Sequence, residues 1–230
     1  MGISCRNIRY RYPGADTFVF KDLSFEMAEP GFNAFFGPSG VGKTSFARLL
    51  AGDLTGHTGE VSLGGIERLA YSYNLERLPG WSTVGRHLEK IVPEVRHDRM
   101  AELIPVFGLE GCLDQRFSQL SLGQKNRVNL IRYLLQDFQL LILDESLANV
   151  DELTRERIIL RMKAMFPETY FIYISHNVVE VSRFCREILV FRGLEKQPSA
   201  AVVRGQDLVE GQAVDTAAFE RTMLEIMNAV

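Results

Sequence analysis

Gly37-Pro-Ser-Gly-Val-Gly-Lys43-Thr44 is an octapeptide that matches the pattern G-x-x-x-x-G-K-[ST]. An apolar run at 32–36 precedes it, and Phe46, Leu49 and Leu50 follow at helical spacing. The segment therefore predicts a strand, a glycine-rich loop and a helix. Glycines let the backbone curl until several N–H groups point at one anion, and the helix adds the positive end of its dipole. We expect this loop to bind the phosphates of a nucleotide.

Two side chains of the loop are expected to act directly on the nucleotide. Lys43 would neutralise the β- and γ-phosphates, and the Thr44 hydroxyl would hold Mg²⁺. The full set of residues expected to contact the nucleotide here is Gly37, Pro38, Ser39, Gly40, Val41, Gly42, Lys43, Thr44 and Ser45. A phosphate loop alone does not choose between a small-molecule kinase, a GTPase, a motor and a transporter ATPase.

Short apolar runs and helical patterns alternate along much of the chain. The runs at 140–143, 171–174 and 188–191 are continuous, as expected for parallel strands covered on both faces. A helical pattern lies between the first two runs and stops at Pro167. This alternation is typical of βαβ units.

Other segments have different periodicities. Leu23, Phe25 and Met27 alternate with polar residues, which predicts a small antiparallel sheet near the N-terminus. The region at about 81–135 has a helical stripe and no convincing strand, which predicts an inserted helical lobe. The predicted fold class is α/β, a P-loop NTPase core with a mostly parallel sheet, an N-terminal antiparallel β-subdomain and an inserted helical subdomain. We expect a single domain over 1–230, with a C-terminal tail at about 192–230.

Composition excludes several classes of protein. Of 230 residues, 46% are hydrophobic and 24% charged, which excludes disordered and rod-like chains. There are 26 Lys and Arg against 29 Asp and Glu, and the net charge of −3 argues against a nucleic-acid partner. Cys5, Cys112 and Cys185 lie far apart, as expected for idle thiols in a reducing cytoplasm. No apolar run approaches the roughly 18 residues that span a bilayer, so a membrane role would require a partner protein.

Asp144 and Glu145 end the apolar run at 140–143, which places them at the carboxyl edge of the sheet beside the phosphate loop. Asp144 there can hold Mg²⁺ through water, and Glu145 can polarise an attacking water molecule. Because acidic residues are common at strand ends, their roles depend on the motifs around them.

Leu120-Ser-Leu-Gly-Gln124 resembles the L-S-G-G-Q signature of ABC-type ATPases. Asp151 and His176 follow in the order of the same family, and the resemblance runs from about Ile3 to Phe191. Independently of the family, Ser121-x-x-Gln124 is the sequence of a capping box, and an apolar stripe follows it at helical spacing. The signature is therefore expected to begin a helix.

The resemblance implies roles for further residues. Ser121, Gly123 and Gln124 would contact ATP bound by a second copy of the chain. His176 would contact the γ-phosphate and position water, so that Lys43, Glu145 and His176 form the expected catalytic set. The family's adenine-stacking aromatic matches Tyr12, with Tyr10 as a rival.

Three positions depart from the family's pattern. Leu122 replaces the first glycine of the signature, and Asn177 replaces an aspartate after the histidine. Asn74 stands where the family has a glutamine that touches Mg²⁺ and links the nucleotide to the helical lobe. Thr44, Asp144 and Asn74 are thus the expected metal residues, although Asn74 could also be an ordinary loop residue.

As a family member, the chain is expected to be an ATPase subunit that forms a head-to-tail dimer around two Mg²⁺-ATP. It would work at the cytoplasmic face of the membrane and dock onto integral membrane permease subunits. Residues 78–84 resemble a stretch in importers of nitrate, sulfonates or taurine, which would add an extracytoplasmic solute-binding protein as partner, although Trp81 could equally be a core residue of the lobe. The alternatives are a non-transport ABC ATPase of DNA repair or translation, a small-molecule kinase, and a degenerate regulator, against which Glu145 argues.

Overall fold

Two β-sheets form the framework of the computed structural model, which describes residues 2–74 and 80–230. The smaller sheet is antiparallel with strand order β2-β1-β4, and its strands are β1 (Ile3–Tyr10), β2 (Phe20–Met27) and β4 (Thr58–Ser62). The larger sheet has the order β5-β6-β7-β3-β8-β9. Its strands are β3 (Gly31–Phe36), β5 (Leu69–Tyr73), β6 (Leu140–Asp144), β7 (Tyr170–Ile174), β8 (Glu187–Phe191) and β9 (Ala200–Arg204). All pairings in it are parallel except that of β9 with β8.

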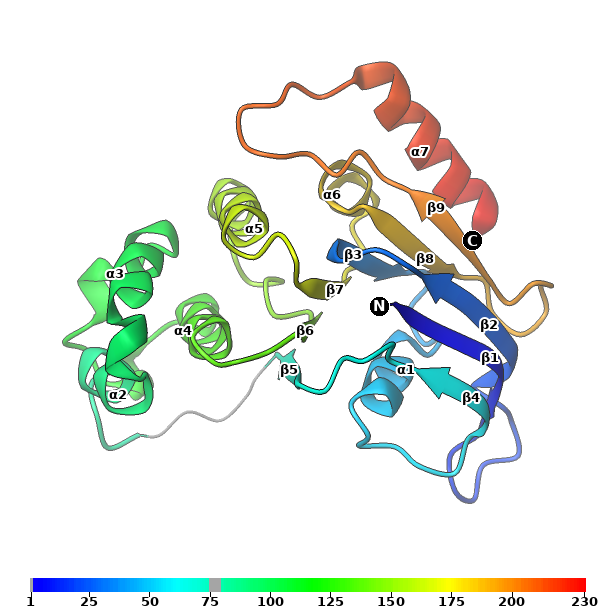
Figure 1. Ribbon diagram of the computed structural model, residues 1–230, viewed down its shortest axis with the longest axis horizontal. Coiled ribbons are helices and arrows are strands. Elements are labelled where there is room, and N and C mark those ends of the chain that lie inside the picture. The colour runs from blue at the N-terminus through cyan, green and yellow to red at the C-terminus, as the bar shows by residue number, and fades with distance from the viewer. Residues whose placement is uncertain (1, 75–79) are drawn as a thin grey trace.

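The helices divide between this core and a separate lobe (Figure 1). Those of the core are α1 (Lys43–Leu50), α5 (Glu152–Met165), α6 (Val178–Phe184) and α7 (Thr216–Ala229). Those of the lobe are α2 (Val84–Ile91), α3 (His97–Val106) and α4 (Leu122–Leu134), with short 3₁₀ turns at Glu94–Arg96, Glu110–Cys112 and Phe117–Gln119. Figure 1 shows the lobe at the β5 end of the larger sheet, away from the antiparallel sheet. No helix in residues 2–74 and 80–230 is long and apolar enough to cross a membrane.

Each central strand contributes to two hydrophobic cores. In β7, Phe171 and Tyr173 lie in the core shared with α5 and the lobe, whereas Ile172 and Ile174 lie in the core shared with α1 and the antiparallel sheet. Because β6, β7 and β8 are buried on both faces, their sequences are apolar without alternation. The α/β fold class and its parallel strands, predicted from these runs, are confirmed.

The structure contains strands that the sequence analysis did not anticipate. β4 and β5 were not predicted, and β9 lies in the expected C-terminal tail. β9 pairs with β8, and the Arg192 Nε atom donates to the Ala229 carbonyl at the end of α7 at 2.8 Å. The tail therefore packs on the sheet. The division of the chain into one domain with a lobe at about 81–135 stays a prediction.

An aromatic cluster holds the phosphate loop on the sheet. Phe46 on α1 is fully buried, and its ring centroid lies between 5.4 and 6.1 Å from those of Phe20, Phe25, Phe35 and Phe191. These rings come from β2, β3 and β8, so one side chain joins the helix after the loop to both sheets. Aromatic pairs of this kind add about 0.5–1.5 kcal/mol beyond their area burial.

We predict that Phe46→Ala lowers the free energy of unfolding by about 3–5 kcal/mol, because it leaves a cavity between the two sheets. Urea unfolding followed by far-UV circular dichroism measures this change. Trp81→Ala is the matched control, since Trp81 is 85% exposed and its truncation should change the free energy by less than about 0.5 kcal/mol. A loss below about 1 kcal/mol in Phe46→Ala would contradict the assigned role of the cluster.

Candidate nucleotide-binding site

The phosphate loop lies between β3 and α1, as predicted. Gly42 precedes α1 with φ +106°, and a Cβ atom there would lie 2.6 Å from Val19 and 2.7 Å from Phe20. Only glycine therefore fits this close approach. Because Gly42 has no side chain, it offers no capping acceptor to the first N–H groups of α1, which suits them to an anion.

Lys43 is held inside the loop. Its Nζ atom donates to the carbonyl oxygens of Gly37 and Pro38 at 2.7 and 2.8 Å. Burial lowers the pKa of Lys43, while the nearby charges of Glu145 and Asp144 oppose that shift. The loop thus holds the ammonium group against its own carbonyl oxygens.

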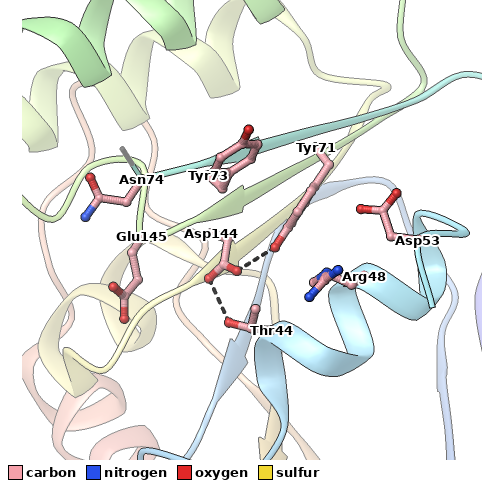
Figure 2. Close-up of a pocket in the computed structure, with 8 residues that line it drawn as sticks. All are labelled: Thr44, Arg48, Asp53, Tyr71, Tyr73, Asn74, Asp144 and Glu145. Carbon is pink, nitrogen blue, oxygen red and sulfur yellow. Dashed lines mark hydrogen bonds between the residues drawn. The ribbon is translucent and has the colours of Figure 1, made fainter. Parts of the chain in front are cut away.

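An open cavity of about 530 Å³ adjoins the loop (Figure 2). Its lining residues are Thr44, Arg48, Asp53, Tyr71, Tyr73, Asn74, Asp144 and Glu145. The Thr44 hydroxyl donates to Oδ1 of the buried Asp144 at 3.2 Å, and the Tyr71 hydroxyl donates to Oδ2 at 2.7 Å. Burial and the bond to Asp144 raise the pKa of Tyr71, so the phenol keeps its proton. A hydroxyl beside a carboxylate is a hard oxygen donor set that fits Mg²⁺.

Glu145 connects this cavity to a second one. It lines both, and the second, of about 370 Å³, also contains Ser175, His176 and Asn177. Glu145 has φ +52°, an uncommon conformation for a residue with a side chain. Such backbone strain persists where the surrounding structure imposes it, and it clusters at active sites. The structure therefore brings the two residues expected to handle water, Glu145 and His176, to one cavity.

Asn177 caps the helix that follows His176. Its Oδ1 accepts hydrogen bonds from the N–H groups of Val179 and Glu180 at 3.0 and 3.3 Å. Asparagine and aspartate are about equally good in this position. Asn177 therefore caps α6 as the family's aspartate would.

Sequence reasoning missed a partly buried ion pair whose arginine, Arg155, lines the same cavity as His176. Arg155 pairs with the Glu180 carboxylate and donates to the Val150 carbonyl at 2.6 Å. The Tyr173 hydroxyl donates to the other oxygen of Glu180 at 2.9 Å. Arg155 thereby ties the segment after Glu145 to α6. No sequence signal identifies the pair, because its members are 25 residues apart on different helices.

Asn74 reaches the cavity but points its amide oxygen elsewhere. Its backbone N–H donates to the Asp144 carbonyl at 3.2 Å, while its Oδ1 accepts from Nδ2 of the buried Asn126 on α4 at 2.8 Å. The oxygen expected to approach Mg²⁺ is thus engaged with the helical lobe. This contact joins the cavity to α4 through one hydrogen bond.

The signature segment begins α4 with the predicted capping box. The N–H of Gln124 donates to the Ser121 Oγ atom at 3.2 Å, and the N–H of Ser121 donates to Oε1 of Gln124 at 2.8 Å. Gly123 packs against the loop after Glu145, and a Cβ atom there would lie 2.2 Å from the Asn149 carbonyl oxygen. Ser121, Gly123 and Gln124 line neither of the two cavities described above. Within one chain, they therefore do not share a cavity with Thr44, Asp144, Glu145 or His176.

The two candidate stacking residues differ in accessibility. Tyr10 is 2% exposed in the core, whereas Tyr12 is 38% exposed and lines an open cavity of about 430 Å³. The hydroxyls of Tyr12 and Ser45 are hydrogen-bonded at 2.8 Å, which places the tyrosine beside the phosphate loop. Of the two rings, only that of Tyr12 is open to a base.

The importer-like stretch at 78–84 is described only in part, because residues 78 and 79 lie outside the described residues. Trp81 is 85% exposed. The alternative that Trp81 is a core residue of the lobe is therefore wrong. Its ring has too little packing around it to stabilise the lobe.

The fold and the loop geometry define a P-loop nucleotide-binding domain. The family described as ABC transporter matches residues 20–148. The Taurine import ATP-binding protein TauB of Pseudomonas putida is 30% identical over 249 residues, covering 99% of this chain and 93% of that protein. The chain belongs to the ABC transporter family.

Two further comparisons show the extent of the similarity. The Molybdenum import ATP-binding protein ModC of Brucella abortus (strain 2308) is 30% identical over 208 residues, and the match covers 81% of this chain but 57% of that protein. The chain thus spans little more than half the length of ModC. A bacterial Atm1-family ABC exporter with ATP bound has the same fold, with a TM-score of 0.73 at 21% identity, over 99% of this chain and 41% of that one.

We predict that Gly123→Ala lowers the free energy of unfolding by about 1–3 kcal/mol, because the added methyl forces α4 away from the Asn149 carbonyl. Thermal unfolding measures this change. Gly111→Ala is the matched control, since a Cβ atom there meets no described atom within 4 Å. Equal melting temperatures for the two variants would contradict the close approach at Gly123.

Proposed function

We propose that the protein binds ATP with Mg²⁺, hydrolyses it between two copies of the chain, and energises the transport of a solute across a membrane through a separate permease. One observation carries this proposal above all. Lys43, Thr44, Asp144 and Glu145 converge where the phosphate loop meets the cavity, and Glu145 also lines the cavity that contains His176.

Each residue has a role that follows from its position. Lys43 exchanges the carbonyls of Gly37 and Pro38 for phosphate oxygens, so its ammonium charge needs little rearrangement to meet the nucleotide. N–H groups of the loop and of the first turn of α1 would bind the remaining phosphate oxygens. Thr44 and Asp144 would hold Mg²⁺, which supplies positive charge to the transferred phosphoryl group. Asn74 would join this metal shell by releasing Asn126.

Glu145 is the proposed base in hydrolysis. Its carboxylate accepts a proton from a water molecule in the space between the two cavities, and that water attacks the γ-phosphate. His176 contacts the γ-phosphate and orients the same water. The ring of Tyr12 stacks on adenine, a contact worth about 1–3 kcal/mol for nucleic-acid bases on aromatic rings.

A second copy of the chain would complete the site. Ser121 and Leu122 are exposed at the start of α4, which offers N–H groups and a helix dipole to an anion. Ser121, Gly123 and Gln124 line neither of the two cavities described in their own chain, and we assign them to a phosphate bound by the partner. A head-to-tail dimer provides this arrangement twice.

The names of the relatives support a role in import. TauB and ModC are both called import ATP-binding proteins, and TauB matches nearly the whole chain. We therefore favour docking onto permease subunits at the cytoplasmic face, in a system that includes an extracytoplasmic solute-binding protein. A small-molecule kinase or an ATPase of DNA repair or translation would instead show ATP turnover that depends on its acceptor or on nucleic acid.

We predict that Glu145→Gln keeps ATP affinity but slows hydrolysis at least about 100-fold, because an amide cannot accept the proton from water. Phosphate release and equilibrium binding of ATP measure the two quantities. The variant should also stay dimeric with ATP in size-exclusion chromatography. Near-normal turnover would remove Glu145 from the role of base.

We predict that Ser121→Asp abolishes hydrolysis without loosening α4. Aspartate caps a helix as well as serine does, yet its charge would repel the partner's γ-phosphate. Ser121→Asn keeps the cap without the charge and serves as control. Both variants should match the wild type in thermal unfolding, while only Ser121→Asp should lose ATPase activity.

Mixing Ser121→Asp with Lys43→Ala tests the shared site directly. Random pairing makes half of the dimers mixed, each with one intact site, so roughly a quarter of wild-type activity should return. Dimer exchange is verified by pull-down of differently tagged chains. No recovery in verified mixed dimers contradicts the arrangement between two chains.

A further inference from the structure

Tyr71 lines the cavity and has a direct contact with its central carboxylate. It lies on β5, where its register partner on β6 is Ile142, two residues before Asp144. Its hydroxyl donates to Oδ2 of Asp144 at 2.7 Å. In Figure 2 the phenol reaches Asp144 from the β5 side, while Thr44 approaches from α1.

The two donors act on different oxygens of Asp144. Thr44 donates to Oδ1 at 3.2 Å, and Tyr71 donates to Oδ2 at the shorter distance of 2.7 Å. The terminal torsion angle of an aspartate has a broad distribution, so hydrogen bonds to neighbouring groups determine how its carboxylate is rotated. One donor on each oxygen fixes that rotation. It leaves Oδ1 beside Thr44, at the start of α1.

We infer that Tyr71 is a positioning residue for the Mg²⁺ site, in which its hydroxyl orients Asp144 so that Oδ1 faces the metal held by Thr44. The inference rests on the proposed function, because Mg²⁺ enters with ATP. Thr44 is expected to bind the metal through the hydroxyl that now contacts Asp144. The Tyr71 hydroxyl is assigned no metal to bind, so it can keep its hydrogen bond to Asp144 when Mg²⁺ is present.

Partners of metal-ligating carboxylates have measurable effects. Their loss typically weakens metal binding 10–100-fold, because the ligand then samples unproductive orientations. Tyr71→Phe removes the hydroxyl and keeps the ring, so the contact between the Tyr71 and Tyr73 rings, at 5.9 Å between centroids, is preserved. The hydroxyl faces an open cavity, so its removal leaves no void in a core.

Tyr73→Phe is the matched control. Tyr73 lies two residues further along β5, lines the same cavity and also carries a phenol. It is half exposed, and both hydrogen bonds described for the Asp144 carboxylate come from other residues, Thr44 and Tyr71. A general effect of removing a phenol from this cavity would appear in both variants.

The experiment measures how much Mg²⁺ tightens nucleotide binding. Binding of the fluorescent, non-hydrolysable analogue mant-AMPPNP is titrated in EDTA and in Mg²⁺, and the ratio of the two dissociation constants is the tightening factor. By linkage, weaker metal binding lowers this factor by the same amount. We expect Tyr71→Phe to lower it roughly 10-fold and to leave binding in EDTA unchanged, while Tyr73→Phe matches the wild type.

Repeating the measurement in the Asp144→Asn variant distinguishes an effect through the orientation of Asp144 from a direct effect of Tyr71 on the nucleotide. In Asp144→Asn, the ligand that Tyr71 orients is already lost, so adding Tyr71→Phe should cause no further decrease. A tightening factor within twofold of wild type in Tyr71→Phe, or an equal decrease in the Asp144→Asn background, overturns the inference. Absence of any mant-AMPPNP binding to the wild-type chain would instead overturn the proposed function itself.

Discussion

The parallel register of β3, β6 and β7 is the constraint on which the site depends. Phe35 and Asp144 both pair with Ile174, so the three strands end at one level. The phosphate loop, Glu145 and His176 therefore leave the sheet at the same edge, where α/β proteins bind ligands. A shift of one residue would exchange the side chains of a strand between two different cores. Packing on both faces thus sets the positions of the chemical groups.

Lys43 and Asp144, two charged groups of the site, have hydrogen-bond partners within the site itself. Lys43 donates to the carbonyls of Gly37 and Pro38, and Asp144 accepts from Thr44 and Tyr71. Buried polar groups without partners would cost about 1–3 kcal/mol each. On the proposed mechanism, nucleotide binding exchanges these bonds for others, so Lys43 and Asp144 are held in place before the nucleotide arrives.

Single polar contacts connect the site to its surroundings. Asn74 bonds to Asn126 on α4, and Arg155 joins the Val150 carbonyl to Glu180 on α6. The Asn149 carbonyl lies against Gly123. Asn74 after β5, and Asn149 and Val150 after β6, are thereby linked to the lobe and to the helix after His176.

Local patterns in the sequence determined much of this protein. The phosphate loop, the buried runs of β6, β7 and β8 and the capping box of Ser121 and Gln124 each follow from residues close together in the chain. Such features depend on backbone geometry and on the period of apolar residues, so they can be derived without knowing what lies opposite. The order of the motifs along the chain then indicated the family.

Tertiary structure alone decided the partners of these residues. β9 has few features of its own, and it becomes a strand because β8 offers an edge to pair with. Tyr71, Arg155 and Glu180 have no local signal, since their roles come from Asp144, from the Val150 carbonyl and from each other. The amide oxygen of Asn74 points to Asn126, 52 residues away, and not freely into the cavity. Contacts between distant residues depend on how the sheet and the lobe pack, which no local pattern encodes.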